Sequence, residues 1–308
     1  MIGHRGRIRR AGGVTARLLA VALLPHTAAW AGDLGPPTQE LRERLALPDF
    51  YEKSLFAGEL PVLGSRRVSD FALQEAAYLV DCILEGRDDL RRAMAEARMR
   101  VVVMAATEFT TDVPEHADLR PAQYWNRRAR GLGASAECPV VSCGEENLLD
   151  LAGDPYRAEN IFIHEFAHTI HEIGLRAVDP GFDARLRAAY DAALSAGRWS
   201  GTYAATSSSE YWAEGVQSWF ECNRANDRDH NDIDTREKIR HYDPPLAALI
   251  ESVFGNRPWR YQKPGARQPP SEHLTGFDRS TAPRFAWPPE LVDLDTREKP
   301  HGGGAGED

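Results

Sequence analysis

The sequence of 308 residues predicts an α+β fold, in which a small N-terminal α/β lobe packs against a largely helical C-terminal lobe with a cleft between them. Three observations predict this fold. Two helical patterns and one short apolar strand follow each other within residues 70–106. A long amphipathic helix is expected at 155–173, and a helix rich in carboxylates and aromatic residues at 209–221.

The first part of the chain is expected to form helices before its first strand. Residues 32–61 contain several prolines and are expected to be mostly linker with short helical pieces. Ser69 is a suitable cap for a helix at 70–85, and a second helix is expected at 88–97. Residues 100–106 are short, apolar and rich in valine, which predicts a buried strand.

The middle of the chain is expected to be irregular. Residues 107–155 contain many prolines and glycines, and strand patterns within them are weak. Asp154 as cap and Pro155 at the first helical position predict the start of the amphipathic helix, which Gly174 is expected to end. A further helix is predicted at 183–196.

The amphipathic helix contains an H-E-x-x-H motif made of His164, Glu165 and His168. Residues four apart lie on one face of a helix, so both imidazoles can reach one metal ion, and Glu165 is then placed to act on a metal-bound water. The opposite face is apolar and is expected to be buried; it carries Ile163, Phe166, Ile170 and Ile173. The alternative is an ordinary helix with two hydrogen-bonded histidines and a surface glutamate.

The second helix carries a stripe of polar residues formed by Glu210, Glu214, Gln217 and Glu221. Beside two histidines, Glu210 would be the third Zn²⁺ ligand. Glu214, one turn further, is expected to hydrogen-bond the free ring nitrogen of a ligand histidine. In the alternative interpretation, Ser207 and Glu210 form a capping box and the stripe faces water.

A third histidine, His171, lies three residues after His168. It could replace Glu210 as a ligand or line the cleft. We expect it in the cleft or in contact with a ligand, outside the ligand set.

The charge of the chain argues against nucleic acid or an anionic membrane as partner. The sequence has 37 Lys and Arg against 46 Asp and Glu. Residues 1–31 hold five arginines and no acid, so the remainder has 32 basic and 46 acidic residues, a formal charge of −14. Such a surface repels polyanions. No stretch is long enough to span a membrane.

The N-terminus has the pattern of an export signal. A basic start precedes the short apolar run 18–24, and Ala29 and Ala31 supply the small residues that signal peptidase recognises. Cleavage is predicted after Ala31, which implies a secreted or periplasmic protein. A disordered basic N-terminus is the alternative.

Four cysteines in an exported chain make disulfides an expectation, with three pairings open. Cys138 with Cys143 and Cys82 with Cys222 is the favoured pairing.

Two further segments are polar or irregular. The Asp- and Asn-rich loop 226–234 is expected to be solvated, with calcium as the alternative. Residues 264–308 are expected to be a tail rich in Pro and Gly, disordered over 301–308.

These motifs resemble the gluzincin metallopeptidases, and most closely the catalytic domain of the anthrax lethal factor group. The similarity covers about residues 155–222. It consists of H-E-x-x-H followed by Tyr203, which precedes Glu210 by seven residues, and by Glu-Tyr-Trp-Ala-Glu at 210–214. The resemblance implies a zincin-like fold with His164, His168 and Glu210 as Zn²⁺ ligands. It also implies Glu165 as general base and Tyr203 as donor to the oxyanion.

We therefore expect a secreted zinc metalloendopeptidase that acts on a peptide or protein substrate. Residues 32–153 would form the N-terminal lobe, and 154–263 the metal-binding helices and C-terminal lobe. The alternatives are a non-catalytic zinc-containing binding protein on the same fold, and a zinc amidase acting on cell-wall material.

Overall fold

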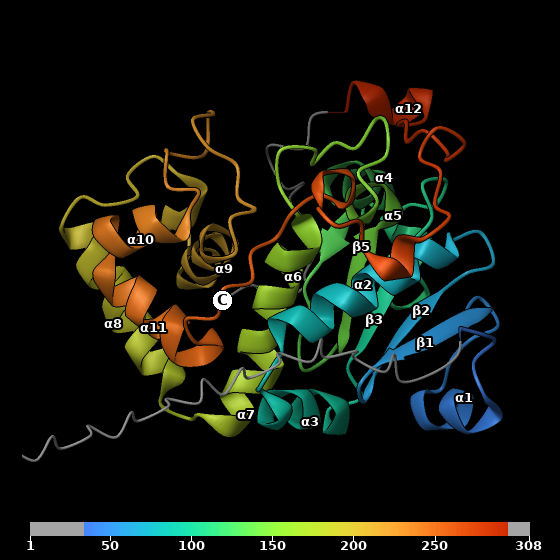
Figure 1. Cartoon of the computed structure of the whole chain (residues 1–308), viewed down its shortest axis with the longest axis horizontal. Coiled ribbons are helices and arrows are strands. Elements are labelled where there is room, and N and C mark those ends of the chain that lie inside the picture. Colours follow the sequence, from blue (N-terminus) through green and yellow to red (C-terminus); the bar gives the residue numbers. More distant parts are fainter. Residues whose placement is uncertain (1–33, 295–308) are drawn as a thin grey trace, which may run out of the picture.

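The computed structural model describes residues 34–294 and shows a mixed α/β protein. A small sheet with its covering helices forms one half, and a group of helices forms the other. Helix α6 lies between the two halves (Figure 1). The predicted export signal, residues 1–31, and the predicted disordered end, 301–308, lie outside the described residues.

The sheet has five strands in the order β1-β2-β3-β5-β4. Strands β2, β3 and β5 are parallel, and β1 and β4 are antiparallel to their single neighbours, β2 and β5. The strands are β1 (Lys53–Ala57), β2 (Leu60–Gly64), β3 (Arg100–Met104), β4 (Gly131–Leu132) and β5 (Val140–Gly144).

Helices cover both faces of this sheet and build the second half. Those of the first half are α1 (Gln39–Leu45), α2 (Asp70–Ile83), α3 (Asp88–Glu96), α4 (Ala122–Arg128) and α5 (Glu145–Leu148). Helix α6 (Ile161–Thr169) lies between the halves and is followed by α7 (Arg176–Val178). The second half contains α8 (Phe182–Ser195), α9 (Ser208–Trp219), α10 (Arg236–Tyr242) and α11 (Pro244–Phe254), and the last helix, α12 (Pro289–Val292), packs against α4 of the first half.

Strand β3 is buried on both faces, as its continuous apolar sequence predicts. Val101 and Val103 face the main core, which also contains residues of α2, α6 and α9. Val102 and Met104 face a second, smaller core that contains Leu41 of α1. The predicted helices at 70–85, 88–97 and 183–196 and the predicted strand at 100–106 are confirmed, each within two residues at its ends.

Four of the five strands, β1, β2, β4 and β5, were not predicted. Residues 32–61 were expected to be mostly linker with short helical pieces; they contain one such helix, α1, but also the start of a hairpin between β1 and β2. Pro61 lies inside β2, and proline within a run argues against a strand in sequence analysis. Residues 107–155 contain β5, the second neighbour of β3, although they were expected to be irregular.

The start of the metal-motif helix differs from the prediction. Asp154 does not cap it; its carboxylate accepts from the Tyr156 amide and so forms a local turn. Helix α6 begins at Ile161, where Asn160 is the cap and accepts a hydrogen bond from the Ile163 amide. The side-chain amide of Asn147 stabilises this turn. Its Nδ2 donates to three oxygens between residues 154 and 159, and its Oδ1 accepts from the backbone N–H of Ile161.

Gly174 does not end the helix. A π-helical segment, Ile170–Leu175, continues α6 and leads into α7. A Cβ on Gly174 would lie 3.1 Å from Leu90 Cδ2 of α3, which is tighter than ordinary contact. The glycine therefore serves close packing between two helices rather than termination.

The expected disulfides are not present. All four cysteines are free thiols, and Cys143 and Cys222 are buried. Cys143 lies within β5 and is buried in the main core, whereas Cys138 lies in a bend before this strand and packs against the smaller core. The two side chains therefore belong to different cores on the two faces of the sheet and are not directed at each other.

The segment 264–294 is packed against the rest of the protein rather than forming a free tail. Arg267 Nη1 and Nη2 lie 2.8 and 2.5 Å from the carboxylate of Glu75, which is fully buried in α2. His273 Nε2 lies 2.7 Å from the same carboxylate. Further along, Phe285 is buried and its ring lies beside Phe109.

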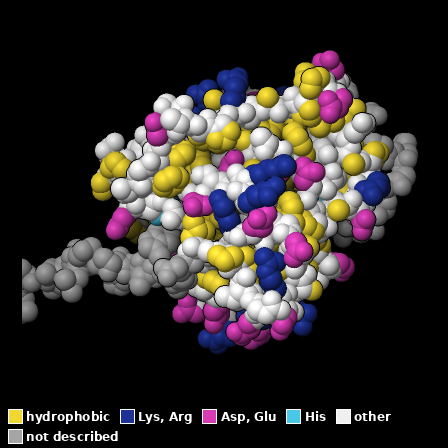
Figure 2. Space-filling model, turned by 90° about the vertical axis from the view of Figure 1, so that its right-hand side faces the viewer, with side chains coloured by type: hydrophobic (Ala, Val, Ile, Leu, Met, Phe, Trp, Pro, Cys, Tyr) yellow, Lys and Arg dark blue, Asp and Glu magenta, His cyan; other side chains and the backbone are white. Residues whose placement is uncertain are grey.

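Helices within residues 34–294 are too short or too polar for any of them to cross a membrane. Figure 2 shows the side of the molecule that carries β1 and α1, where basic, acidic and hydrophobic side chains are interspersed. The basic side chains on this face have acidic ones beside them and do not form one continuous patch.

We predict that His116 makes the protein sensitive to acid. Its ring is buried with Nε2 3.0 Å from Ser142 Oγ, and burial lowers its pKa to about 4. Because the unfolded chain binds this proton more readily, stability is full above pH 6.5 and falls as the pH drops toward 4. His116 should reduce the free energy of unfolding by about 2 kcal/mol between pH 7.5 and pH 5.

Urea unfolding of wild type and His116→Gln at these two pH values measures this contribution, since other titrating groups cancel in the comparison. The variant should show a smaller loss on acidification by about 2 kcal/mol. His241→Gln, which removes an exposed histidine, is the control and should behave as wild type. An equal pH dependence of wild type and His116→Gln would contradict the assignment.

Candidate metal site

The candidate site forms where helices α6 and α9 pack against each other. Trp212 of α9 is fully buried, and its Nε1 donates to the carbonyl oxygen of Ala167 in α6 at 2.9 Å. Ile163, Phe166, Ile170 and Ile173 are buried on the other side of α6, as predicted. The remaining face of α6 therefore turns its histidines toward α9.

The structure brings His164, His168 and Glu210 together. His164 Nε2 lies 3.1 Å from Glu210 Oε2 and 3.1 Å from His168 Nε2. His168 Nε2 lies 3.3 Å from Glu210 Oε2. Within residues 34–294, these three side chains are the group of His, Cys, Asp and Glu whose donor atoms are arranged to hold a metal ion.

These spacings fit a tetrahedral metal ion. Zn²⁺ binds imidazole nitrogen and carboxylate oxygen at about 2.0–2.1 Å, so ligand atoms at two corners of a tetrahedron are roughly 3.3 Å apart. The three donor atoms have separations of 3.1, 3.1 and 3.3 Å and can occupy one face of such a tetrahedron. The fourth corner would remain for water or substrate.

Gln217 orients the first histidine. Its Nε2 donates to Glu159 Oε2 and to the Asn160 carbonyl, so its Oε1 is the atom that faces His164. His164 Nδ1 donates to this oxygen at 2.8 Å. With a proton held on Nδ1, the lone pair of Nε2 would be available to a metal ion placed between Glu210 and His168.

Glu214 lies beside the free ring nitrogen of a ligand histidine, as predicted, but does not form the predicted hydrogen bond with it. Glu214 Oε1 lies 3.6 Å from His164 Nδ1, beyond hydrogen-bond distance, while Gln217 occupies that position. The Glu214 carboxylate instead accepts from Asn223 Nδ2 at 2.9 Å and lies 3.3 Å from His230 Nε2. Residues four and seven positions after Glu210 share its face, and the rotation of α9 decides which one reaches the histidine.

The second histidine has a different partner. His168 Nδ1 lies 2.8 Å from Ser209 Oγ. Ser207 caps α9, because its Oγ accepts from the Glu210 amide. This half of the capping box exists, but the Glu210 carboxylate is turned to the histidines, so the alternative in which the stripe faces water is wrong. Glu221 alone of the stripe is exposed.

His171 is not part of the site. It is buried, its Nε2 lies 2.7 Å from Asp183 Oδ1, and its ring packs against Phe182 and Trp212. Three residues after His168, the helix has turned this side chain toward α8. The expectation that it lies in the cleft or touches a ligand is therefore wrong.

Glu165 and Tyr203 lie beside the three donors. Tyr203 OH donates to Glu210 Oε1 at 3.1 Å. The Glu165 carboxylate is close enough to interact electrostatically with both histidines and with Glu210. Desolvation raises the pKa of Glu165 although the two histidines oppose the shift, and such a carboxylate binds a proton more readily than an exposed one.

The charges of the site are strongly coupled. Burial by itself lowers the pKa of His164, but the carboxylates of Glu210, Glu165 and Glu214 outweigh burial and raise that pKa well above its usual value. Burial likewise raises the pKa of Glu210, and hydrogen bonds from His164 and His168 reverse the shift and lower it. A cation between these groups is therefore electrostatically favoured, whether it is a proton or a metal ion.

Two glycines let the edge strand β4 approach α6. A Cβ on Gly131 would lie 3.0 Å from Glu165 Cγ. A Cβ on Gly133 would lie 2.9 Å from His168 Cβ and 3.2 Å from the Glu165 carbonyl oxygen. Larger residues at these positions would push the strand away from the candidate site.

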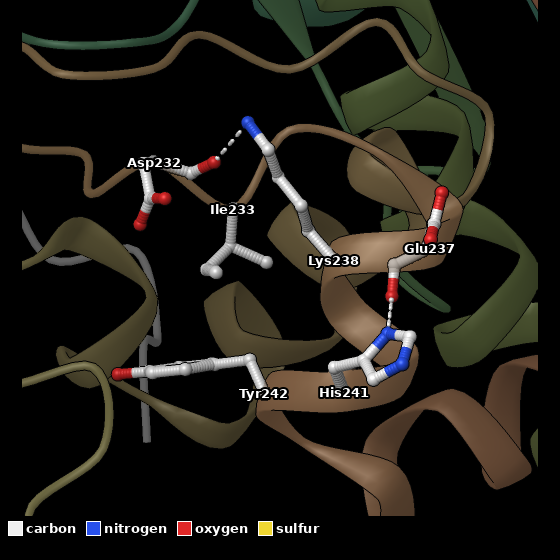
Figure 3. A pocket seen from close by; sticks show the side chains of 6 residues that line it. All are labelled: Asp232, Ile233, Glu237, Lys238, His241 and Tyr242. Carbon is white, nitrogen blue, oxygen red and sulfur yellow. Dashed lines mark hydrogen bonds between the residues drawn. The ribbon is translucent and has the colours of Figure 1, made fainter.

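A surface hollow lies away from the candidate site. It has a volume of about 440 Å³ and lies over α10 (Figure 3), lined by Asp232, Ile233, Glu237, Lys238, His241 and Tyr242. Its basic group is already occupied, because Lys238 Nζ binds the Asp232 carbonyl and the Asp234 carboxylate. In the neighbouring loop 226–234, Asp227 pairs with His230 and Arg224, so its carboxylate is not directed at a shared cation.

We predict that Gln217→Ala weakens zinc binding by about 10–100-fold, the usual effect of losing a partner of a ligand histidine. Removing the acceptor of His164 Nδ1 frees the ring to rotate. Competition with a chromogenic chelator measures the affinity. Glu221→Ala, exposed and just beyond the end of the same helix, should bind zinc as wild type does. An unchanged affinity of Gln217→Ala would contradict this role.

Comparison with known proteins adds no assignment. No protein-family model matches the chain, and no curated protein matches it significantly.

Proposed function

We propose that the protein is an exported zinc-dependent metallopeptidase with a zincin-like fold. The observation that carries this proposal is that five side chains come together from α6, from α9 and from the short turn before α9 that contains Tyr203. His164, His168 and Glu210 form the metal group, with Glu165 and Tyr203 beside it. The donor set of two imidazoles and one carboxylate with an open position is typical of catalytic zinc.

The chain's own residues supply the other parts of a hydrolytic site. Zn²⁺, when bound, would polarise the scissile carbonyl and acidify water. Glu165, whose pKa is raised by desolvation, would accept a proton from the attacking water and pass it to the leaving amine. Tyr203 OH would donate a hydrogen bond to the carbonyl oxygen as negative charge develops on it. Gln217 would keep His164 in the required tautomer.

The surroundings of the site favour a peptide as substrate. Strand β4 lies at the end of the sheet, with β5 as its only neighbour among the strands of residues 34–294, and it runs beside Glu165. An extended peptide can pair with such an edge through main-chain hydrogen bonds. A non-catalytic binding protein would also explain the metal group. It would give no role to the Glu165 carboxylate, whose pKa is raised and which lies beside that group.

We predict that Glu165→Gln keeps zinc and loses turnover by about 10²–10⁴-fold, because the proton acceptor is removed while the ligands remain. Glu210→Ala should lose zinc. Peptide-library digestion read by mass spectrometry gives turnover, and metal analysis of the purified variants gives zinc content. Zinc retained by Glu210→Ala would refute the ligand set. Wild type that binds zinc and cleaves no peptide would refute peptide hydrolysis.

We predict that Tyr203→Phe lowers kcat by about 10²-fold or more with little change in KM, because the hydroxyl acts on charge that develops in the transition state. The phenol ring remains to fill the space, and zinc content should be unchanged. Tyr190→Phe, whose hydroxyl donates to the Ala205 carbonyl, is a matched control with a similar loss of one hydroxyl. Turnover of Tyr203→Phe at the wild-type rate would remove Tyr203 from the mechanism.

A further inference from the structure

Three arginines at the junction of α4 and β4 have three different environments. Arg130 is fully buried and binds Glu146 through Nε at 2.6 Å and Nη2 at 3.0 Å. The guanidinium of Arg127 lies 4.9 Å from the centre of the Trp287 ring. Arg128 is exposed, and its guanidinium forms no ion pair with a carboxylate of residues 34–294.

The backbone of Arg128 is fixed at the margin of the candidate metal site. Tyr156 OH donates to the Arg128 carbonyl at 3.0 Å, and Thr110 Oγ1 donates to the next carbonyl, that of Ala129, at 2.6 Å. Three residues after Arg128, Gly131 lies so near Glu165 that a Cβ added to it would be 3.0 Å from Glu165 Cγ. The short connection keeps the arginine next to the proposed general base.

The side chain of Arg128 is directed toward the site. Its charge acts on the hydroxyls of Tyr203 and Tyr156 and on the Glu165 carboxylate. The Tyr203 hydroxyl donates to Glu210 and also contacts the Arg128 guanidinium, and a neutral phenol does not neutralise that charge. Arg128 is therefore an exposed cation at the margin of the site, with guanidinium donors left over beyond the one that faces Tyr203.

We propose that Arg128 determines specificity by binding a carboxylate of the substrate close to the scissile bond. A guanidinium matches the planar geometry of a carboxylate and can form two parallel hydrogen bonds with it. The carboxylate belongs either to an Asp or Glu side chain or to the C-terminus of a peptide. This inference rests on the proposed peptidase function and names the substrate class of the same site.

The test compares the full-length zinc-loaded enzyme with Arg128→Gln, Arg128→Lys, Arg128→Glu and the control Arg127→Gln. Arg127→Gln removes the same charge from the adjacent position. Peptide pools with free or amidated C-termini identify cleaved sequences, and pairs that differ only in Glu against Gln then give kcat/KM. In wild type, the carboxylate peptide should be favoured by about 10–100-fold, mostly through KM.

Arg128→Gln should abolish this preference, Arg128→Lys should retain part of it, and Arg128→Glu should favour Lys in place of Glu. Arg127→Gln should preserve the wild-type ratio. If amidation of the peptide C-terminus abolishes the preference, Arg128 binds the C-terminal carboxylate. If replacing Glu with Gln abolishes it, Arg128 binds the Glu side chain. A wild-type enzyme without either preference, or Arg128→Gln with the wild-type ratio, would overturn the inference.

If the protein is not a peptidase, neither wild type nor any variant will cleave any of the peptide pools. This result differs from cleavage without a carboxylate preference. Binding of fluorescent degenerate peptides with a fixed Glu or Gln to zinc-loaded protein still reads the role of Arg128. Tighter binding of the Glu pool that is lost in Arg128→Gln and kept in Arg127→Gln supports carboxylate recognition. Equal binding of both pools to wild type overturns it.

Discussion

The packing of α6 against α9 is the constraint on which the candidate site depends. His164 and Glu210 are 46 positions apart in the sequence, and only this contact brings their side chains within 3.1 Å. Two hydrogen bonds across the interface fix its rotation and translation: one from Trp212 to the Ala167 carbonyl and one between Gln217 and His164. Because α6 also packs on the sheet and on α3 through its continuation, the site inherits its position from the main core.

The electrostatics of the interface follow from this packing. Glu210, Glu214 and Glu159 are all brought into or beside a poorly solvated space, where an unpaired carboxylate is costly. Each has a cationic or hydrogen-bonding partner: the two histidines for Glu210, His230 and Asn223 for Glu214, and Gln217 with Arg224 for Glu159. The loop that contributes His230 also holds the Tyr203 amide through the carbonyl of Asp229, so the partners of these charges also position the tyrosine.

Sequence analysis succeeded where local geometry was sufficient. The spacing of His164 and His168 follows from the helix repeat alone, and the apolar pattern identified the buried face of α6. It failed where distant residues decide the outcome. The choice between Glu214 and Gln217 depends on the rotation of α9, which neighbouring helices set. The start of α6 depends on Asn147, which is 14 residues away from its partner Ile161.

The attachment of segment 264–294 has a consequence for the order of folding. Glu75 is fully buried within the first half of the protein, yet its partners Arg267 and His273 are 192 and 198 positions further along the chain. Until those residues are available, α2 cannot pack into its final place without leaving an uncompensated carboxylate in the core. The native packing of the first half is therefore complete only when Arg267 and His273 are in place. Segment 264–294 therefore delays native structure until nearly the whole protein is present. Its contacts with α2 also couple the two halves into one cooperative unit.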